Sequence, residues 1–147
     1  MNISNGQLWK YSKFIENKNY SFSRDEILKN ITKEQIDEAY LTISKWNGYS
    51  STPLLKLNKL SKELNLNTIY YKDESKRFNL KSFKALGGAY AVDKVTKGNK
   101  DIIVSTATAG NHGRSVAWGA KRLGLKCKIF ISEYVSEARG EAMQALG

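Results

Sequence analysis

The sequence has 147 residues, 41% of them hydrophobic, which is enough for one domain with its own core. The formal net charge is +10, and the excess is uneven: residues 1–48 carry 7 basic and 6 acidic groups, whereas residues 49–147 carry 17 and 8. Because no run of clustered Lys and Arg with interleaved aromatic residues occurs, we expect no nucleic-acid partner, and the basic part of the chain fits a small anionic ligand.

Residues 1–48 are predicted to form a polar, helical extension. Ser23 and Thr32 each stand three residues before a Glu or Gln, which is the spacing of a capping box at a helix start. After the second start, apolar residues recur at helical spacing and predict an amphipathic helix packed on the main body: Ile36, Ala39, Tyr40, Ile43 and Trp46.

Residues 49–147 alternate predicted strands and helices, interrupted by a charged turn near residue 75. The expected elements are strands at 54–57, 68–72, 102–105 and 126–132, and helices at about 59–64, 82–95, 111–123 and 136–146. This alternation predicts an α/β fold with a parallel sheet, flanking helices and right-handed crossovers. No strand follows the last helix, so we interpret the chain as an incomplete part of a larger fold.

Cysteine usage and hydropathy predict a cytoplasmic protein with no membrane contact. Cys127 is the only cysteine and cannot form an internal disulfide, which fits a reducing compartment. We expect it to be a small buried residue of its strand. The first residues lack a basic region followed by an apolar core, and no apolar run reaches 18 residues, so neither a signal peptide nor a membrane span is predicted.

One of the 19 lysines, Lys84, has unusual neighbours. In a helix that begins near Ser82 it shares a face with three small residues: Gly87, Gly88 and Ala91. Two glycines inside a helix cost about 1 kcal/mol each relative to alanine, so we expect a bulky group to lie against this face. An amine above a glycine floor beside Phe83 suits a covalently bound flat ring, because a desolvated lysine is nucleophilic enough to condense with an aldehyde.

Asp73 and Glu74 close the second predicted strand. They have the composition of a paired general acid and base. We prefer the interpretation that they hold the following turn through ion pairs with Lys76 and Arg77, because nearby opposite charges suffice for them. The catalytic alternative stays open at this point.

The loop at 106–113 joins a predicted strand to a helix start. Free N–H groups and the helix dipole favour an anion at such a position. His112 lies there and is the only histidine of the sequence. A lone histidine beside a helix start is more often structural than catalytic, and a His-based metal site needs a second one, so we predict no metal.

Four segments occur in the order and spacing of fold-type-II pyridoxal-phosphate enzymes, the group of threonine deaminase and the tryptophan synthase β-subunit: Thr52-Pro53-Leu54, Lys72-Asp73-Glu74-Ser75, Ser82-Phe83-Lys84 and Ala109-Gly110-Asn111-His112-Gly113. Within this group the residue patterns at 72–78, 83–91 and 110–118 most closely resemble diaminopropionate ammonia-lyase. The resemblance covers roughly residues 49–147, and members of that family are much longer. It therefore implies the N-terminal portion of the catalytic fold.

The resemblance implies pyridoxal 5'-phosphate as cofactor. Lys84 would hold it through the cofactor's aldehyde, with Phe83 beside the ring, and Asn111 would hydrogen-bond the phenolic oxygen of the ring. The substrate's carboxylate would be held by residues of the loop and helix start: Thr106, Thr108, Ala109, Gly110 and His112.

The implied reaction is β-elimination of ammonia from 2,3-diaminopropionate, a small amino acid. Lys84 would move the proton at the α-carbon, and the aminoacrylate product would hydrolyse to pyruvate and ammonia. By analogy with the group, we expect a homodimer when the enzyme has its full length.

Two departures from the family pattern limit the activity that we expect of this chain. Family members have an acidic residue, assigned to proton abstraction from the D-substrate, at the position of Ala109. A methyl group cannot accept a proton, so activity on D-diaminopropionate is not expected. The family's glycine-rich phosphate loop lies beyond the part that matches, so the 147-residue chain alone is expected to bind the cofactor weakly and to turn over little.

Two alternatives remain. A serine/threonine deaminase has the same fold type, but its pattern has arginine two places after the cofactor lysine, where this chain has Leu86. A non-catalytic fragment that acts as a binding or interaction module belongs to a different class.

Overall fold

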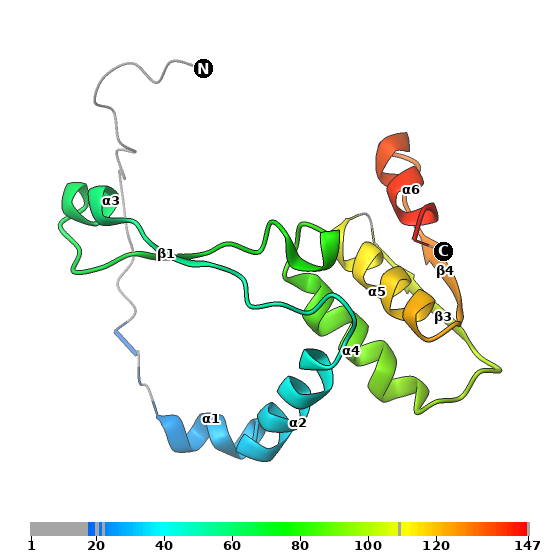
Figure 1. Ribbon diagram of the computed structural model, residues 1–147, viewed down its shortest axis with the longest axis horizontal. Helices are drawn as coiled ribbons and strands as arrows, with labels where there is room; N and C mark the ends of the chain where they lie inside the picture. The colour runs from blue at the N-terminus through cyan, green and yellow to red at the C-terminus, as the bar shows by residue number, and fades with distance from the viewer. Residues whose placement is uncertain (1–17, 20, 22, 109, 147) are drawn as a thin grey trace. The chain divides into compact units, whose positions relative to one another are not determined.

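The computed structural model describes residues 18–19, 21, 23–108 and 110–146 (Figure 1). By its internal contacts the chain divides into two units, residues 1–33 and 34–147. The predicted site residue Ala109 lies outside the described residues.

Two helices form near the N-terminus, α1 (Arg24–Asn30) and α2 (Lys33–Ser44). They begin where the capping signals predicted helix starts. The Ser23 hydroxyl accepts a hydrogen bond from the Glu26 N–H (3.3 Å) and so caps α1. A cap of this kind stabilises a helix by about 1 kcal/mol, which matters for a helix of only 7 residues.

The apolar stripe of α2 is covered only toward its C-terminal end. Trp46, just beyond the helix, is 6% exposed, whereas Ile36 is 52% and Tyr40 61% exposed. The predicted packing is therefore wrong for Ile36 and Tyr40. Helical periodicity identifies an apolar face, but it does not identify a surface that covers it.

Strands β1 (Leu54–Lys56) and β2 (Tyr70–Lys72) form a separate two-stranded antiparallel sheet, with α3 (Asn58–Glu63) between them in the sequence. The Ser61 hydroxyl ties α3 to the second strand, because it accepts a hydrogen bond from the Ile69 N–H at 2.9 Å. Both strands were predicted, but they do not join the parallel sheet.

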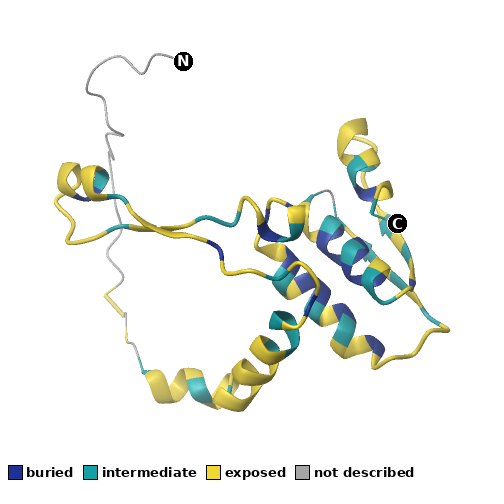
Figure 2. Ribbon diagram, in the orientation of Figure 1, coloured by how far each residue is buried: buried dark blue, intermediate teal, exposed yellow. Residues whose placement is uncertain are grey.

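Strands β3 (Ile103–Ala107) and β4 (Lys126–Phe130) pair in parallel, and α5 (Asn111–Arg122) connects them as a βαβ unit. Along each strand, half-buried residues alternate with exposed ones (Figure 2). The half-buried residues, such as Val104 and Ile129, pack against a small core: Val92, Val116, Ala120 and Leu125. The predicted parallel sheet with flanking helices is thus confirmed in this part of the chain.

Helix α4 (Lys84–Thr96) packs lengthwise on α5 through two close approaches. A β-carbon on Gly88 would stand 1.9 Å from the Ser115 Oγ. A β-carbon on Gly119 would stand 2.7 Å from the Ala89 Cα. Figure 1 shows α4 and α5 running in the same direction, and the Gly88–Ser115 contact lies four residues after the first residue of each helix, so the two N-terminal ends lie at the same end of the helix pair.

Gly87 and Gly88 have different surroundings, which corrects the predicted glycine floor. Gly88 is buried against α5, so helix packing explains its missing side chain. Gly87 is exposed, and among the described residues no atom lies within 4 Å of the position of a β-carbon. Of the two glycines, only Gly87 offers open space to a ligand beside Lys84.

Helix α6 (Glu137–Gln144) follows β4 and packs near the start of α5. Met143 is 5% exposed, and its sulfur would lie 2.8 Å from a β-carbon on Gly113. The absence of a side chain at Gly113 therefore lets the last helix approach α5.

The two adjacent glycines of α4 give a matched test of this packing. Gly88→Ala should lower the free energy of unfolding by about 1–3 kcal/mol, because the new methyl overlaps Ser115 and forces the helices apart. Gly87→Ala should raise it by up to about 1 kcal/mol, because alanine is the better helix former and meets nothing. Urea denaturation followed by circular dichroism measures both. Equal effects of the two substitutions would contradict the described packing.

Candidate functional site

Lys84 is the first residue of α4, and its side chain is exposed. Ser82, which is 8% exposed, fixes this helix start, because its hydroxyl accepts a hydrogen bond from the Lys84 N–H (3.2 Å). Phe83 beside it is 62% exposed. The amine is thus accessible to a small molecule. The desolvation expected from the sequence is wrong for this chain, since the described residues leave Lys84 in water.

Asn111 and His112 open helix α5, and both are exposed. Gly110 occupies the N-cap position and has no side chain to cap the first turn. The free N–H groups of that turn and the helix dipole favour an anion. Since α4 and α5 run in the same direction, the starts of the two helices place Lys84 and Asn111 at one end of the helix pair (Figure 1).

Thr106 and His112 line a hollow of about 440 Å³ between α4, β3 and α5. The rest of its lining is mainly apolar and includes Val92, Val95 and Ile103. Val95 and Ile103 are 78% and 64% exposed, so this hollow presents open hydrocarbon surface. Its chemistry suits apolar contact better than a charged substrate.

Gly110 and Asn111 line a second hollow, of about 320 Å³, between α5 and α6. Arg114 and Arg139 line it as well, and the Arg114 Nε is buried without a hydrogen-bond partner among the described residues. Two guanidinium groups beside a helix start favour a carboxylate or a phosphate. Neither arginine was predicted from the sequence as a site residue.

Thr108 has a mainly structural position between these hollows. Its N–H donates a hydrogen bond to the Phe130 carbonyl (2.9 Å), which extends the pairing of β3 with β4. Its methyl group would lie 3.0 Å from a β-carbon on Gly113. The structure therefore brings the predicted residues to neighbouring positions along one strand end and two helix starts, but it does not gather them around a single hollow.

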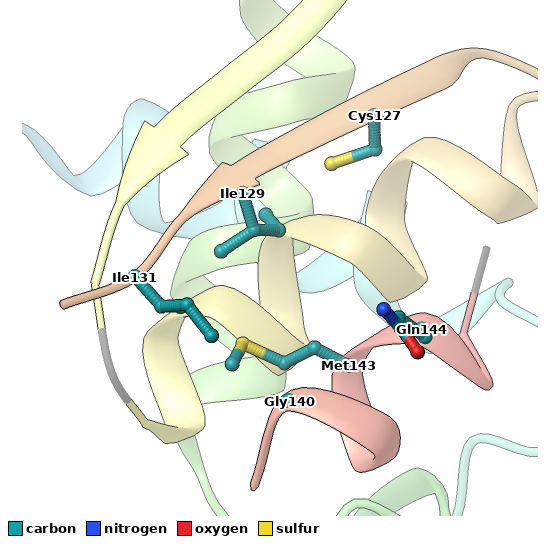
Figure 3. A pocket seen from close by; sticks show the side chains of 6 residues that line it. All are labelled: Cys127, Ile129, Ile131, Gly140, Met143 and Gln144. Carbon is teal, nitrogen blue, oxygen red and sulfur yellow. The ribbon is translucent and has the colours of Figure 1, made fainter. Parts of the chain in front are cut away.

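A third hollow, of about 290 Å³, lies between β4 and α6 and contains the free thiol of Cys127 (Figure 3). Figure 3 shows the Ile131 and Met143 side chains directed toward one another at one end of this hollow. Cys127 is half-buried, and burial raises the pKa of its thiol above the ordinary range. A thiol in this state is a poor nucleophile, which agrees with the predicted structural role of Cys127.

Arg77 is the centre of a hydrogen-bonded network at the charged turn. It is 6% exposed, and its Nε donates to the Glu74 Oε2 at 2.7 Å. The Arg77 hydrogen bond is the main reason that the pKa of Glu74 lies below its ordinary value. The predicted ion-pair interpretation is confirmed for Glu74 and Arg77. Asp73 differs, because its carboxylate accepts a hydrogen bond from the Ser75 N–H (3.0 Å) within the turn.

Among the described residues there is no cluster of three or more His, Cys, Asp or Glu side chains that could hold a metal ion. In the same part of the chain, the helices are too short or too polar to cross a membrane.

A family model described as pyridoxal-phosphate dependent enzyme matches residues 45–147, which is more than half of the chain. The chain belongs to this family. The resemblance seen in the sequence is thereby confirmed at the family level.

Two curated relatives differ in their reactions. The chain is 39% identical to the diaminopropionate ammonia-lyase of Salmonella typhimurium over 68% of its own length and 30% of that protein. It is 37% identical to the biosynthetic L-threonine dehydratase IlvA of Staphylococcus epidermidis over 69% of its own length and 23% of that protein. The chain thus spans less than a third of the length of these relatives.

The chain also resembles a solved structure of an ammonia-lyase. The Escherichia coli diaminopropionate ammonia lyase, in complex with an aminoacrylate-PLP azomethine reaction intermediate, is 36% identical to this chain. The match has a TM-score of 0.72 and covers 78% of this chain and 32% of that one. The predicted fold class is therefore confirmed by likeness to a pyridoxal-phosphate enzyme of known structure.

The residues of this pyridoxal-phosphate family member fit the family's cofactor. The Lys84 amine is exposed and unencumbered, as condensation with an aldehyde requires. Gly87, one turn further along the same face of α4, leaves open space for a flat ring. Phe83 exposes most of its aromatic side chain next to both of them. These three residues form one exposed surface at the start of α4.

The Glu74–Arg77 pair should make stability depend on pH in the acid range. A carboxylate whose pKa is lower in the folded state stabilises the fold above its unfolded pKa, about 4.3 for glutamate, and this stabilisation is lost as the pH falls through the folded pKa. The free energy of unfolding of the wild type should therefore exceed that of Glu74→Gln at neutral pH. The difference should vanish in acid, as measured by urea denaturation at a series of pH values.

Glu63→Gln, at the exposed end of α3 and outside this network, is the matched control. A difference between the wild type and Glu74→Gln that is the same at neutral and acid pH would contradict the assignment.

Proposed function

We propose that this chain is the lysine-bearing N-terminal part of a pyridoxal-phosphate-dependent ammonia-lyase that acts on 2,3-diaminopropionate. One observation carries the proposal: the close packing of α4 on α5 puts the exposed Lys84 amine at the same end of the helix pair as the free start of α5. Similarity to diaminopropionate ammonia-lyases at 36–39% identity supports the choice of reaction.

In this proposal the Lys84 Nζ would hold the cofactor through its aldehyde group, with Phe83 beside the ring and the Asn111 side chain toward the phenolic oxygen. When bound, the cofactor supplies an electron sink that stabilises negative charge at the substrate's α-carbon. The Lys84 amine would serve as the base that moves the proton at the α-carbon.

The substrate's carboxylate is proposed to bind at the start of α5. Free N–H groups at the helix start and the dipole hold it there, beside the loop residues predicted to bind it, which are Thr106, Thr108, Ala109, Gly110 and His112. Arg114 adds a nearby cationic group, whose Nε has no hydrogen-bond partner in the part of the chain that the structure describes. Fixing the carboxylate orients the C–H bond for cleavage by Lys84.

A threonine dehydratase is the second candidate, because a relative of that activity is 37% identical to the chain. The residue two places after the lysine is Leu86, where the deaminase pattern has arginine. This difference and the longer match to the ammonia-lyase, 39% identical over 122 residues against 37% over 101, favour diaminopropionate.

We also propose that the catalytic fold begins near residue 49, that residues 1–48 are a helical extension, and that the full-length protein is a cytoplasmic homodimer. The family match starts at residue 45, which supports the first part. The single free cysteine is compatible with a reducing compartment.

Trapping with borohydride tests the central assignment. Pyridoxal phosphate is added to the protein, borohydride reduces any lysine–cofactor C=N bond to a stable amine, and peptide mapping finds the label. We expect the label on Lys84, and we expect Lys84→Arg to remove it while Lys81→Arg leaves it in place. Label on another lysine, or on none, would refute the proposed function.

The substrate is tested on a protein in which this chain is joined to the family's remaining portion. We expect pyruvate from L-2,3-diaminopropionate and much less 2-oxobutyrate from threonine. With Ala109 in place of an acidic residue, we expect no turnover of the D-isomer. If the protein prefers threonine, the proposed reaction is wrong and the protein is a threonine dehydratase.

A further inference from the structure

The seven residues that lead from Arg77 to Lys84 have an unusual backbone. Phe78, Asn79 and Lys81 have φ values of +47°, +59° and +56°. Residues other than glycine rarely adopt this left-handed region, and such strain persists only where the surroundings impose it. Something must therefore hold the segment that precedes Lys84.

The Arg77 side chain donates four hydrogen bonds. Besides its two bonds to Glu74, its Nη1 donates to the Ser50 carbonyl (2.7 Å) and its Nη2 to the Thr52 Oγ1 (3.0 Å). The Thr52 hydroxyl also donates to the Glu74 carboxylate. Arg77 thus joins the segment before β1 to the turn after β2, and only a planar fork of donors meets these acceptors together.

An aromatic cluster fixes the next residue, Phe78. Its ring centroid lies 4.6 Å from that of Trp118 on α5 and 6.0 Å from that of Trp46. The Arg77 guanidinium lies 5.8 Å from the Phe78 ring centroid and 5.5 Å from that of Tyr49. The strained segment is therefore anchored at its first two residues on both α5 and the region before β1.

Two further hydrogen bonds lie between this anchor and Lys84. The Leu80 N–H donates to the Arg77 carbonyl (2.9 Å), and Leu80 is 4% exposed. Two residues later, the buried Ser82 hydroxyl accepts from the Lys84 N–H (3.2 Å). The backbone of residues 80–82 joins these two bonds, so a short segment in which Leu80 and Ser82 are buried leads from Arg77 to the start of α4.

We infer that Arg77 is a positioning residue for Lys84: by joining residues 50–52 to the strained turn, it sets where the Lys84 amine is presented to the cofactor. This inference rests on the proposed function, in which Lys84 binds pyridoxal phosphate. Arg77 touches neither cofactor nor substrate and acts only through the backbone of residues 78–83. Lysine at this position keeps the charge but cannot reach Ser50, Thr52 and Glu74 at once.

The test measures how selectively pyridoxal phosphate labels Lys84. A protein in which this chain is joined to the family's remaining portion, and its Arg77→Lys and Arg122→Lys variants, are each treated with pyridoxal phosphate and borohydride over a range of pH. Peptide mapping then gives the label on Lys84 relative to the mean of the other 18 lysines of this chain. Circular dichroism confirms that each protein is folded at the assay temperature, so that a loss of stability alone does not change the ratio.

Arg122→Lys is the matched control. Arg122 also lies over the aromatic cluster, 4.0 Å from the Trp46 ring centroid, but among the described residues its ion pair is with Asp93 of α4 and not with the turn that leads to Lys84. We expect Arg77→Lys to lower the selectivity for Lys84 by about tenfold and Arg122→Lys to change it by less than about twofold. Folded Arg77→Lys with wild-type selectivity would overturn the inference.

Milder variants keep the inference testable if Arg77→Lys does not fold. Thr52→Val and Glu74→Gln each remove part of the network, and we expect each to lower the selectivity for Lys84 to an intermediate value. Unchanged selectivity in both would overturn the inference. If the wild-type protein, with this chain joined to the family's remaining portion, shows no preference for Lys84, the proposed function fails and the inference fails with it. If the wild type is labelled preferentially at Lys84 and every variant keeps this preference, the inference about Arg77 is wrong and the proposed function stands.

Discussion

The close approach of α4 to α5 is the contact on which the candidate site depends. The spacing between packed helices is set by the side chains at their contact, and here the contact residues are Gly88, Ser115, Ala89 and Gly119. Because there is no room for even one added methyl, the two helices are locked in one relative position along their length. That position puts the start of α4, with its lysine, beside the start of α5, with its free N–H groups. Neither helix start would form a site alone.

The hydrogen bonds of Arg77 offset the backbone strain of the turn before Lys84. A left-handed conformation costs a residue other than glycine roughly 1–2 kcal/mol, and three residues adopt it between Arg77 and Lys84. Hydrogen bonds to charged groups contribute about 1.5–3 kcal/mol each, and Arg77 donates four. Together the four hydrogen bonds outweigh the cost of the three left-handed residues, so the network is strong enough to hold the turn. Buried Leu80 and Ser82 then transmit that geometry to the helix start.

Local patterns in the sequence predicted the elements that local forces form. The Ser23 cap and the βαβ alternation from Ile103 to Phe130 depend on spacing along the chain, and they were predicted correctly. Contacts between distant residues were missed. Gly88 was assigned to a ligand because its partner, Ser115, lies on another helix, and the bonds of Arg77 to the segment before β1 have no local signature. The antiparallel pairing of β1 with β2 was likewise not evident, since strand direction is decided by the connection and not by composition.

The sequence led us to expect that the chain both places the Lys84 amine and removes water from it, but the structure shows the side chain exposed. The location of the amine is set by this chain, through the turn, the Ser82 cap and the packing of α4 on α5. The described residues do not remove water from the amine, because the Lys84 side chain is exposed. A flat ring bound over Gly87 and against Phe83 would cover the same surface that Lys84 leaves open, because residues three apart on a helix share a face. In the proposed function, desolvation would follow from binding the cofactor, and the part of the protein described here would hold the amine where the ring binds.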